Sequence, residues 1–319
     1  MKKLLYITFI FFLYSCEQEE IGIDPHTQGE RNNIQIELEQ DYKKQVYYSI
    51  DNNEITSENL KTEWDLAFEA SSNGWRIVLN SSKFSKVSKI ESGNFNENIS
   101  EDSLIWNWEI PLGINYGTAL GDYRTEEVFF VIDNGFNLSG VSNGYKKIKI
   151  EEQNEYYYKI KFSNLDNTNL DSLKIYKNEE YNFIYFSFTN GIINVEPEKN
   201  NWDLLFTQYT HLYNDPSLPP AYLVTGVLIN YLNNTKVAKD TINNFENIKY
   251  NMVSSYNFSD YQNIIGFDWK EFDGSNYSIT PNLTFIIETS SNRYFKLRFT
   301  DFYNSSGVKG YPTFEIQEL

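Results

Sequence analysis

Aromatic and β-branched residues alternate with polar residues along much of the chain. In residues 156–162, for example, Tyr158 and Ile160 fall on one face of an extended strand, while Lys159 and Lys161 fall on the other. No stretch keeps a helical period for more than about two turns. The pattern predicts an all-β fold, mainly antiparallel sheet with few short helices. Strands are expected at residues 45–50, 75–79, 127–132, 146–150, 156–162, 183–188, 283–288, 294–299 and 313–316.

One segment of the chain occurs twice. Residues 47–68 and 185–206 align without a gap, and 10 of their 22 positions are identical, including a Trp-Asp-Leu triplet. A second pair, YYKIKF at 157–162 and YFKLRF at 294–299, has nearly the same spacing. Two tandem related β modules are therefore predicted, at residues 38–165 and 174–319.

The repeated Trp-Asp pairs are Trp64-Asp65 and Trp202-Asp203. A tryptophan side chain fills a core, and an aspartate accepts backbone N–H groups at a turn. Retention at equivalent places in both copies therefore favours a role in the fold, and each pair fits the start of a core strand.

The N-terminus has the pattern of a lipoprotein signal. Two lysines precede an apolar run, residues 4–14, which is too short to cross a bilayer and is typical of a secretory signal. The run ends in Leu-Tyr-Ser-Cys, which resembles a lipobox. We therefore expect a signal peptide at residues 1–15 and a thioether-linked lipid on Cys16, the one cysteine of the chain.

Residues 16–37 are predicted to be an acidic tether. The cluster that begins at Glu17 resembles the surface-export signal of Bacteroidetes lipoproteins, although an ordinary solvated charge run has the same composition. The expected location is the outer membrane, with the protein anchored by lipid on the cell surface; retention on the periplasmic face is the alternative.

The composition narrows the range of partners. The formal net charge is −17, which opposes binding to the phosphate backbone of nucleic acids. The chain holds 25 Tyr, 23 Phe and 6 Trp, side chains that bury large areas, so most of it is expected to be ordered.

The segments around both Trp-Asp pairs, and the ending NRYFKLRFTDFYNSSGVKGYPTFEIQEL, resemble the central motif of HmuY-like lipoproteins of Bacteroidetes. The resemblance covers most of the mature chain and recurs in both halves. It implies an all-β, outer-membrane lipoprotein related to proteins that capture haem and pass it to a TonB-dependent receptor. For this chain, the resemblance implies haem as the ligand. It implies a TonB-dependent receptor as the partner.

The haem ligands of the family do not transfer to positions here. The chain has two histidines, His26 in the tether and His211 after the second Trp-Asp pair, and Met252 is the one methionine left after signal cleavage. Imidazole and thioether groups both ligate haem iron, so His211 with Met252 is a candidate pair. A lone histidine is more often a hydrogen-bonded or exposed side chain than a metal ligand.

A proline-rich loop at residues 214–222 is present in the second copy alone. Tyr209 and Tyr213 before it and Tyr222 at its end offer aromatic faces on which a flat ligand or a sugar ring could stack. The alternative function is therefore a non-catalytic surface lipoprotein that binds a glycan or a protein partner without haem. The other reading is a covered loop whose tyrosines pack into the protein.

Sequence motifs of catalysis are absent. The chain contains no GxSxG, HExxH, P-loop or dinucleotide-binding fingerprint. A Ser-His-Asp triad would have to use His211, which has no flanking signal for it. We therefore expect a binding protein and not an enzyme, with no metal beyond the iron of a bound haem.

Overall fold

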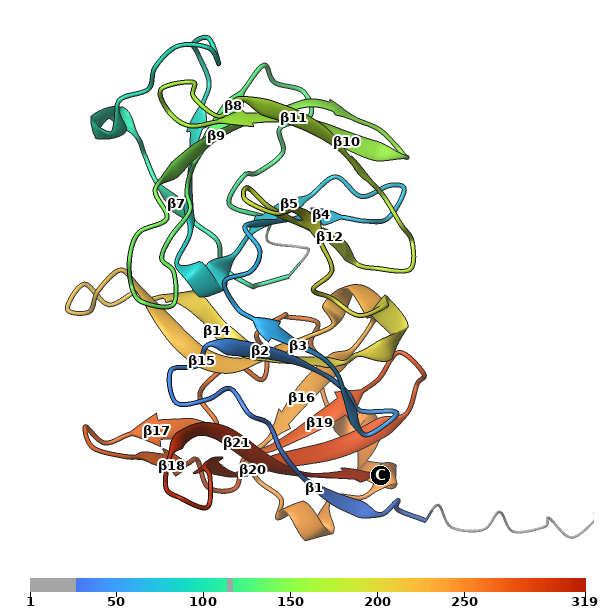
Figure 1. The fold of residues 1–319 in the computed structure, drawn as a ribbon. Coiled ribbons are helices and arrows are strands. Elements are labelled where there is room, and N and C mark those ends of the chain that lie inside the picture. Colours follow the sequence, from blue (N-terminus) through green and yellow to red (C-terminus); the bar gives the residue numbers. More distant parts are fainter. Residues whose placement is uncertain (1–26, 114–116) are drawn as a thin grey trace, which may run out of the picture.

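The computed structural model describes residues 27–113 and 117–319. The predicted signal peptide, Cys16, His26 and the first part of the tether lie outside these residues. In the described part, antiparallel sheets are joined by turns and short 3-10 helices, which confirms the predicted all-β fold (Figure 1). No helix in this part is long and apolar enough to span a membrane.

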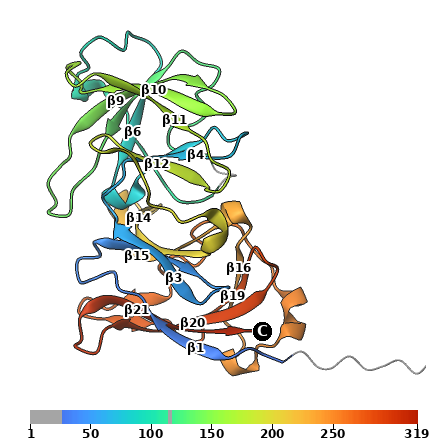
Figure 2. The same cartoon turned by 45° about the vertical axis from the view of Figure 1, so that its right-hand side comes forward.

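The strands form two lobes, which both views separate (Figures 1 and 2). In the second lobe, lower in Figure 1, a five-stranded sheet of order β1-β21-β20-β19-β16 faces a four-stranded sheet of order β15-β14-β2-β3, with the β17–β18 hairpin beside them. Its strands are β1 (Arg31–Gln35), β2 (Lys44–Ser49), β3 (Glu54–Leu60), β14 (Leu204–Leu212), β15 (Ala221–Ile229), β16 (Lys236–Asp240), β17 (Lys270–Phe272), β18 (Tyr277–Ile279), β19 (Thr284–Glu288), β20 (Tyr294–Tyr303) and β21 (Lys309–Glu318).

The first lobe, upper in Figure 1, combines a six-stranded sheet of order β11-β10-β9-β8-β6-β7 with a four-stranded sheet of order β13-β12-β4-β5. Its strands are β4 (Leu66–Glu69), β5 (Ile77–Leu79), β6 (Lys86–Ile90), β7 (Asn107–Trp108), β8 (Phe129–Asp133), β9 (Tyr145–Gln153), β10 (Tyr157–Ser163), β11 (Asp171–Tyr176), β12 (Phe183–Ser187) and β13 (Gly191–Ile193). Each of the nine stretches predicted to be strands overlaps one of the observed strands. The alternation of apolar and polar residues therefore predicted these strands correctly.

The two lobes repeat one strand order and exchange strands between the sequence copies. In the corresponding sheets, β11, β12 and β13 of the first lobe occupy the places that β1, β2 and β3 occupy in the second. The strand β2 pairs with β14, and the equivalent β12 pairs with β4. Each copy therefore supplies its first three strands to the lobe built on the other copy.

The exchange makes the first lobe a single stretch of sequence, from β4 to β13, that is inserted between the two parts of the second lobe. The predicted modules, residues 38–165 and 174–319, remain a prediction about the copies in the sequence. The lobes of the structure do not coincide with these two residue ranges, because the residues before β4 belong to the second lobe.

The second pair of similar sequences proves not to be structurally equivalent. The segment 157–162 forms β10, whereas 294–299 lies in β20, which matches β9 in the order of the sheets. The buried Lys147 of β9 and Lys296 of β20 mark the true equivalence. The Lys147 Nζ atom donates to the Phe95 carbonyl (2.7 Å), and that of Lys296 to the Phe245 carbonyl (2.8 Å). Beyond the Trp-Asp strands the copies are thus offset by about 150 residues, because the second copy has the longer loop.

Both Trp-Asp pairs lie where the exchanged strands join their new lobe. The Asp65 Oδ2 atom accepts the Phe188 backbone N–H (2.7 Å), and the Asp203 Oδ2 atom accepts that of Ile50 (2.8 Å). Each aspartate of one copy therefore holds the hairpin of the other. This arrangement confirms the predicted role of the Trp-Asp pairs in the fold.

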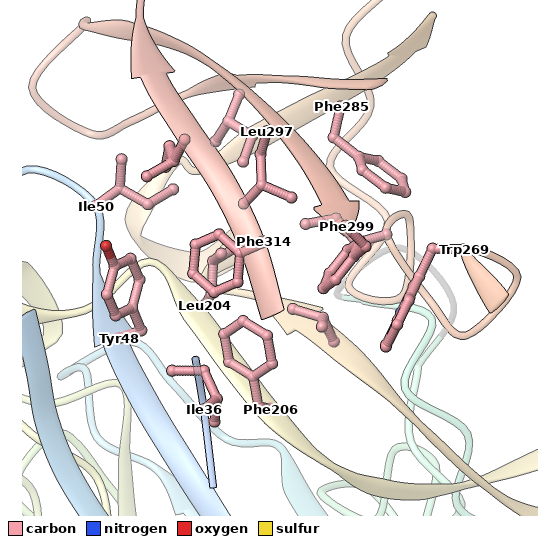
Figure 3. Packing of buried hydrophobic residues seen from close by; sticks show 14 of the residues in the cluster. Ile36, Tyr48, Ile50, Leu204, Phe206, Trp269, Phe285, Leu297, Phe299 and Phe314 are labelled. Atoms are coloured by element: carbon pink, nitrogen blue, oxygen red, sulfur yellow. The ribbon is translucent and has the colours of Figure 1, made fainter. Parts of the chain in front are cut away.

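The main core fills the space between the two sheets of the second lobe (Figure 3). The rings of Phe206 and Phe314 stack across it, with centroids 5.5 Å apart, and Tyr48 meets Phe314 edge-on at 5.5 Å. Trp269, almost fully buried, stacks on Phe299 at 3.8 Å. Because Tyr48 belongs to β2, residues from the N-terminal part of the chain are needed to complete this core.

Candidate functional site

The candidate haem ligand His211 lies near the end of β14, opposite Tyr222 of β15. Its ring packs edge-on against Tyr213, at a centroid distance of 4.9 Å, and against Phe267, at 5.0 Å. The side chain is half-buried, and burial lowers the pKa of the imidazole below its ordinary value. The ring is therefore mostly neutral at pH 7, the form in which a nitrogen lone pair can bind a metal.

The three tyrosines predicted to flank a binding loop have different environments. Tyr209 lies in the strand β14, is almost fully buried and packs with Val224 and Leu228, so it belongs to the interior. Tyr213 is half-buried beside His211, and Tyr222 is 57% exposed. Of the three, Tyr213 and Tyr222 can meet a ligand that approaches from solvent.

The proline-rich loop joins β14 to β15 as the end of a long hairpin, where Tyr213 donates its backbone N–H to the Pro220 carbonyl (3.2 Å). Residues 214–220 are exposed. The Asp215 Oδ1 atom accepts both the backbone N–H (2.8 Å) and the hydroxyl (2.7 Å) of Ser217, which fixes the tip of the hairpin. The loop thus stands free beside His211.

The β17–β18 hairpin supplies further aromatic surface near this end of the lobe. Phe272, 58% exposed, lies against Tyr277 with ring centroids 4.9 Å apart. Lys270 is buried among aromatic rings and donates to the Thr225 carbonyl, and burial lowers its pKa to about 7. No sequence motif marks these residues, since tertiary contacts alone bring them to β15.

Met252, the other candidate ligand, lies in a different element, the 3-10 helix η7 (Tyr250–Ser255). Its backbone N–H bonds to the Lys249 carbonyl (2.9 Å), and its carbonyl accepts the Ser255 hydroxyl (2.6 Å). The structure places His211 among Tyr213 and Phe267 and shows no contact to Met252 within the described residues. The pairing of the two side chains stays a prediction.

The pocket between the lobes is too small for a porphyrin. It is lined by Trp64, Tyr185 and the buried Glu109 among others, and its volume is about 80 Å³, whereas small-molecule sites usually span about 300–1,000 Å³. Among residues 27–113 and 117–319, no group of three or more His, Cys, Asp or Glu side chains is arranged to hold a metal ion. Iron binding by His211 at the end of β14 stays a prediction.

Comparison with known proteins relates part of the chain to a protein family. Residues 179–316, which include β12 to β20 and most of β21, match the HmuY protein family. The match assigns this region, which is less than half of the chain, to the HmuY family. His211, Tyr213 and Tyr222 all lie inside the matched region, so the candidate site is part of the HmuY-like portion of the protein.

Solved structures similar to this chain include apo PinO from Porphyromonas gingivitis, with 8% identity, 91% of this chain and 97% of that chain covered, and a TM-score of 0.29. Another is an apo HmuY analogue (TFO) from Tannerella forsythia, with 10% identity, coverages of 93% and 98%, and a TM-score of 0.27. Neither likeness is close enough to transfer a site or a ligand. None of the curated proteins compared with the chain matches it.

Proposed function

We propose that this protein is a lipid-anchored, non-catalytic binding protein of the outer membrane that captures haem at the end of β14. The observation that supports this most directly is the half-buried His211, held between Tyr213 and Phe267 inside the region that matches the HmuY family. The absence of catalytic sequence motifs and the expected role of HmuY relatives in capture are consistent with binding rather than turnover.

The residues present fit one axial position of haem. A neutral imidazole binds haem iron through a ring nitrogen, and aromatic rings form a flat apolar surface on which a porphyrin can rest. Tyr213 is two residues from His211 and already touches its ring, so it is badly placed to reach the opposite face of the same haem. The second axial ligand is therefore Met252 or another side chain, unless this chain supplies a single ligand.

A haem titration of the purified mature chain tests the proposal. We expect a shifted Soret band in the wild-type protein and its loss in His211→Ala. His26→Ala is the matched control, since it removes the other histidine of the chain and should leave the band unchanged. A wild-type protein with no spectral change would contradict haem capture and favour the glycan or protein partner.

The anchor and the partner complete the proposal. We expect the Cys16 sulfur to carry the lipid, and two or three acyl chains give stable anchoring. Labelled palmitate should enter the wild-type protein in cells, whereas Cys16→Ser should stay unlabelled and leave the membrane fraction. A TonB-dependent receptor is the proposed recipient of the haem, and co-purification from outer membranes with and without haem tests this step.

A further inference from the structure

The first lobe carries a groove of about 360 Å³ where its two sheets end, lined by residues of β11, β12, β13 and the loop between β11 and β12. The volume lies within the range of small-molecule sites. The strands β11 and β13 each form the edge of a sheet, so the groove opens between two edges. It lies in the lobe that does not contain His211, and it is separate from the proposed haem site.

The lining combines aromatic rings with polar groups, which include one lysine, Lys174, whose Nζ atom lies over the Tyr157 ring at 3.8 Å. Tyr176 is 65% exposed, and Tyr181 and Phe183 are partly exposed. The amides of Asn178 and Asn194 lie at the same groove. Aromatic faces bind the apolar faces of flat rings, while a few amide and hydroxyl groups fix their orientation.

The wall of the groove contains a buried carboxyl group, Glu196. Glu196 is buried, and burial raises its pKa to about 8. Its oxygen atoms accept from the Asn182 side chain (2.7 Å), the Phe183 backbone N–H (3.1 Å) and the Trp202 indole (3.1 Å). The oxygen atoms of Glu196 are therefore already bonded within the protein, and burial favours the neutral form of this side chain.

The equivalent place in the second lobe carries ion pairs instead of aromatic rings. The residues 138 positions before Tyr181, Asn182 and Glu196 are Lys43, Lys44 and Glu58. Lys44 pairs with Glu58 (3.5 Å) and with Glu39 (3.6 Å), and Lys43 also pairs with Glu39. The same hairpin position is thus charged and self-paired in one lobe, but aromatic and open in the other.

We infer that this groove binds a neutral oligosaccharide. Aromatic faces flanked by amides and hydroxyl groups suit the mixed apolar and hydroxylated faces of a sugar, and the net charge of −17 disfavours a polyanion. Addition of a peptide strand is less suited, since β13 has three residues and β11 carries Asp171 and Lys174, charged side chains typical of protected edges.

The test is a glycan array probed with the purified mature chain, followed by calorimetry with the hexasaccharides of N-acetylglucosamine, glucose (α-1,4) and glucose (β-1,4). We expect binding to at least one neutral glycan, weakened roughly tenfold in Tyr176→Ala and Tyr181→Ala. Tyr176→Phe, which keeps the ring, should retain most of the affinity. Tyr156→Ala is the matched control, because Tyr156 is 66% exposed and does not line the groove.

Thermal melting of each variant separates loss of binding from loss of fold. A lack of binding to any neutral glycan, binding to sulfated or sialylated glycans alone, or equal affinity in Tyr156→Ala and Tyr176→Ala would each overturn the inference. The haem titration of His211→Ala reports on the other lobe, so the two proposals fail independently.

Discussion

The hydroxyl oxygen of Tyr47 lies 3.3 Å from that of Tyr185, its equivalent in the other sequence copy 138 residues later. Each ring also meets the tryptophan of the other copy edge-on, Tyr47 with Trp202 at 5.0 Å and Tyr185 with Trp64 at 4.9 Å. Equivalent residues meet in this way when two copies are related by a local twofold axis. The lobes are therefore joined by a symmetric, buried aromatic contact.

The nested arrangement of the lobes predicts which fragments fold. Residues 61–198 contain every strand of the first lobe, β4 to β13, and should give a folded monomer with native-like circular dichroism and a cooperative melt. Residues 38–165 have a similar length but lack β11, β12 and β13, so their core stays open and they should aggregate or remain unfolded. Equal folding of both fragments would contradict the exchange of strands.

The two Trp-Asp aspartates should differ in their importance for stability. Asp65 forms a buried ion pair with Lys83, whereas the residue 150 positions after Lys83 is the uncharged Asn233, and Asp203 instead accepts the Thr235 hydroxyl (3.3 Å). Asp65→Ala leaves an unpaired buried lysine and should cost about 3–5 kcal/mol of unfolding free energy. Asp203→Ala removes hydrogen bonds without stranding a charge and should cost about 1–3 kcal/mol.

Urea unfolding followed by tryptophan fluorescence measures both losses. The double variant Asp65→Ala/Lys83→Met should recover part of the stability that Asp65→Ala loses, because no charge is then left buried. A larger loss in Asp203→Ala than in Asp65→Ala would show that the ion pair is not what distinguishes the copies.

Stability should fall between pH 5 and pH 7. Burial raises the pKa of Glu196 and of Glu109 to about 8, well above the value in the unfolded chain. In this window the folded state holds more protons than the unfolded state, so a rise in pH favours unfolding. The buried Lys270, with a pKa lowered to about 7, is protonated in both states over most of this window and contributes little to the slope.

The variant Glu196→Gln isolates one carboxyl group. It should reduce the loss of unfolding free energy between pH 5 and pH 7 by roughly 1–3 kcal/mol. Glu127→Gln, at an exposed carboxylate, serves as its control and should keep the wild-type slope. Chemical unfolding at a series of pH values gives the slopes, and identical slopes in Glu196→Gln and wild type would rule out a neutral Glu196.

Haem affinity should fall in acid, if the proposed function holds. Iron binding by His211 requires the neutral imidazole, and burial lowers the pKa of this side chain, so protonation should release haem with a midpoint below the ordinary value of about 6.5. A Soret titration from pH 8 to pH 5 measures the midpoint. Release centred above pH 7 would assign the titrating group to another residue.

Local patterns predicted the strands well and their arrangement poorly. The alternation in residues 156–162 marks β10 because side chains on two faces of a strand have different surroundings. Strands with weaker alternation, such as β3 and β11, were missed, since both lie at sheet edges where most side chains are exposed. Local sequence patterns do not predict the exchange of strands. The strand β2 could pair equally well with the equivalent strand of either copy.

The candidate site was predictable in part for a similar reason. His211 and the proline-rich loop stand out by residue type, but the burial of Tyr209 and the contact to Phe267 depend on how β14 meets distant segments. Another repeated motif in the sequence identifies structurally equivalent strands better than the pair at 157–162 and 294–299 does. The motif Lys-Val-x-Lys at 86–89 and 236–239, 150 residues apart, marks the equivalent strands β6 and β16.

Because the first lobe is inserted into the second, the backbone passes from one lobe to the other twice, once before β4 and once after β13. Two covalent connections between the same two bodies define a hinge axis, which is the line that joins them. Twisting of one lobe about the long axis of the molecule would strain both connections, whereas bending about the line through them would not. Any movement that alters the spacing of the two lobes is thereby confined to a swing in one plane.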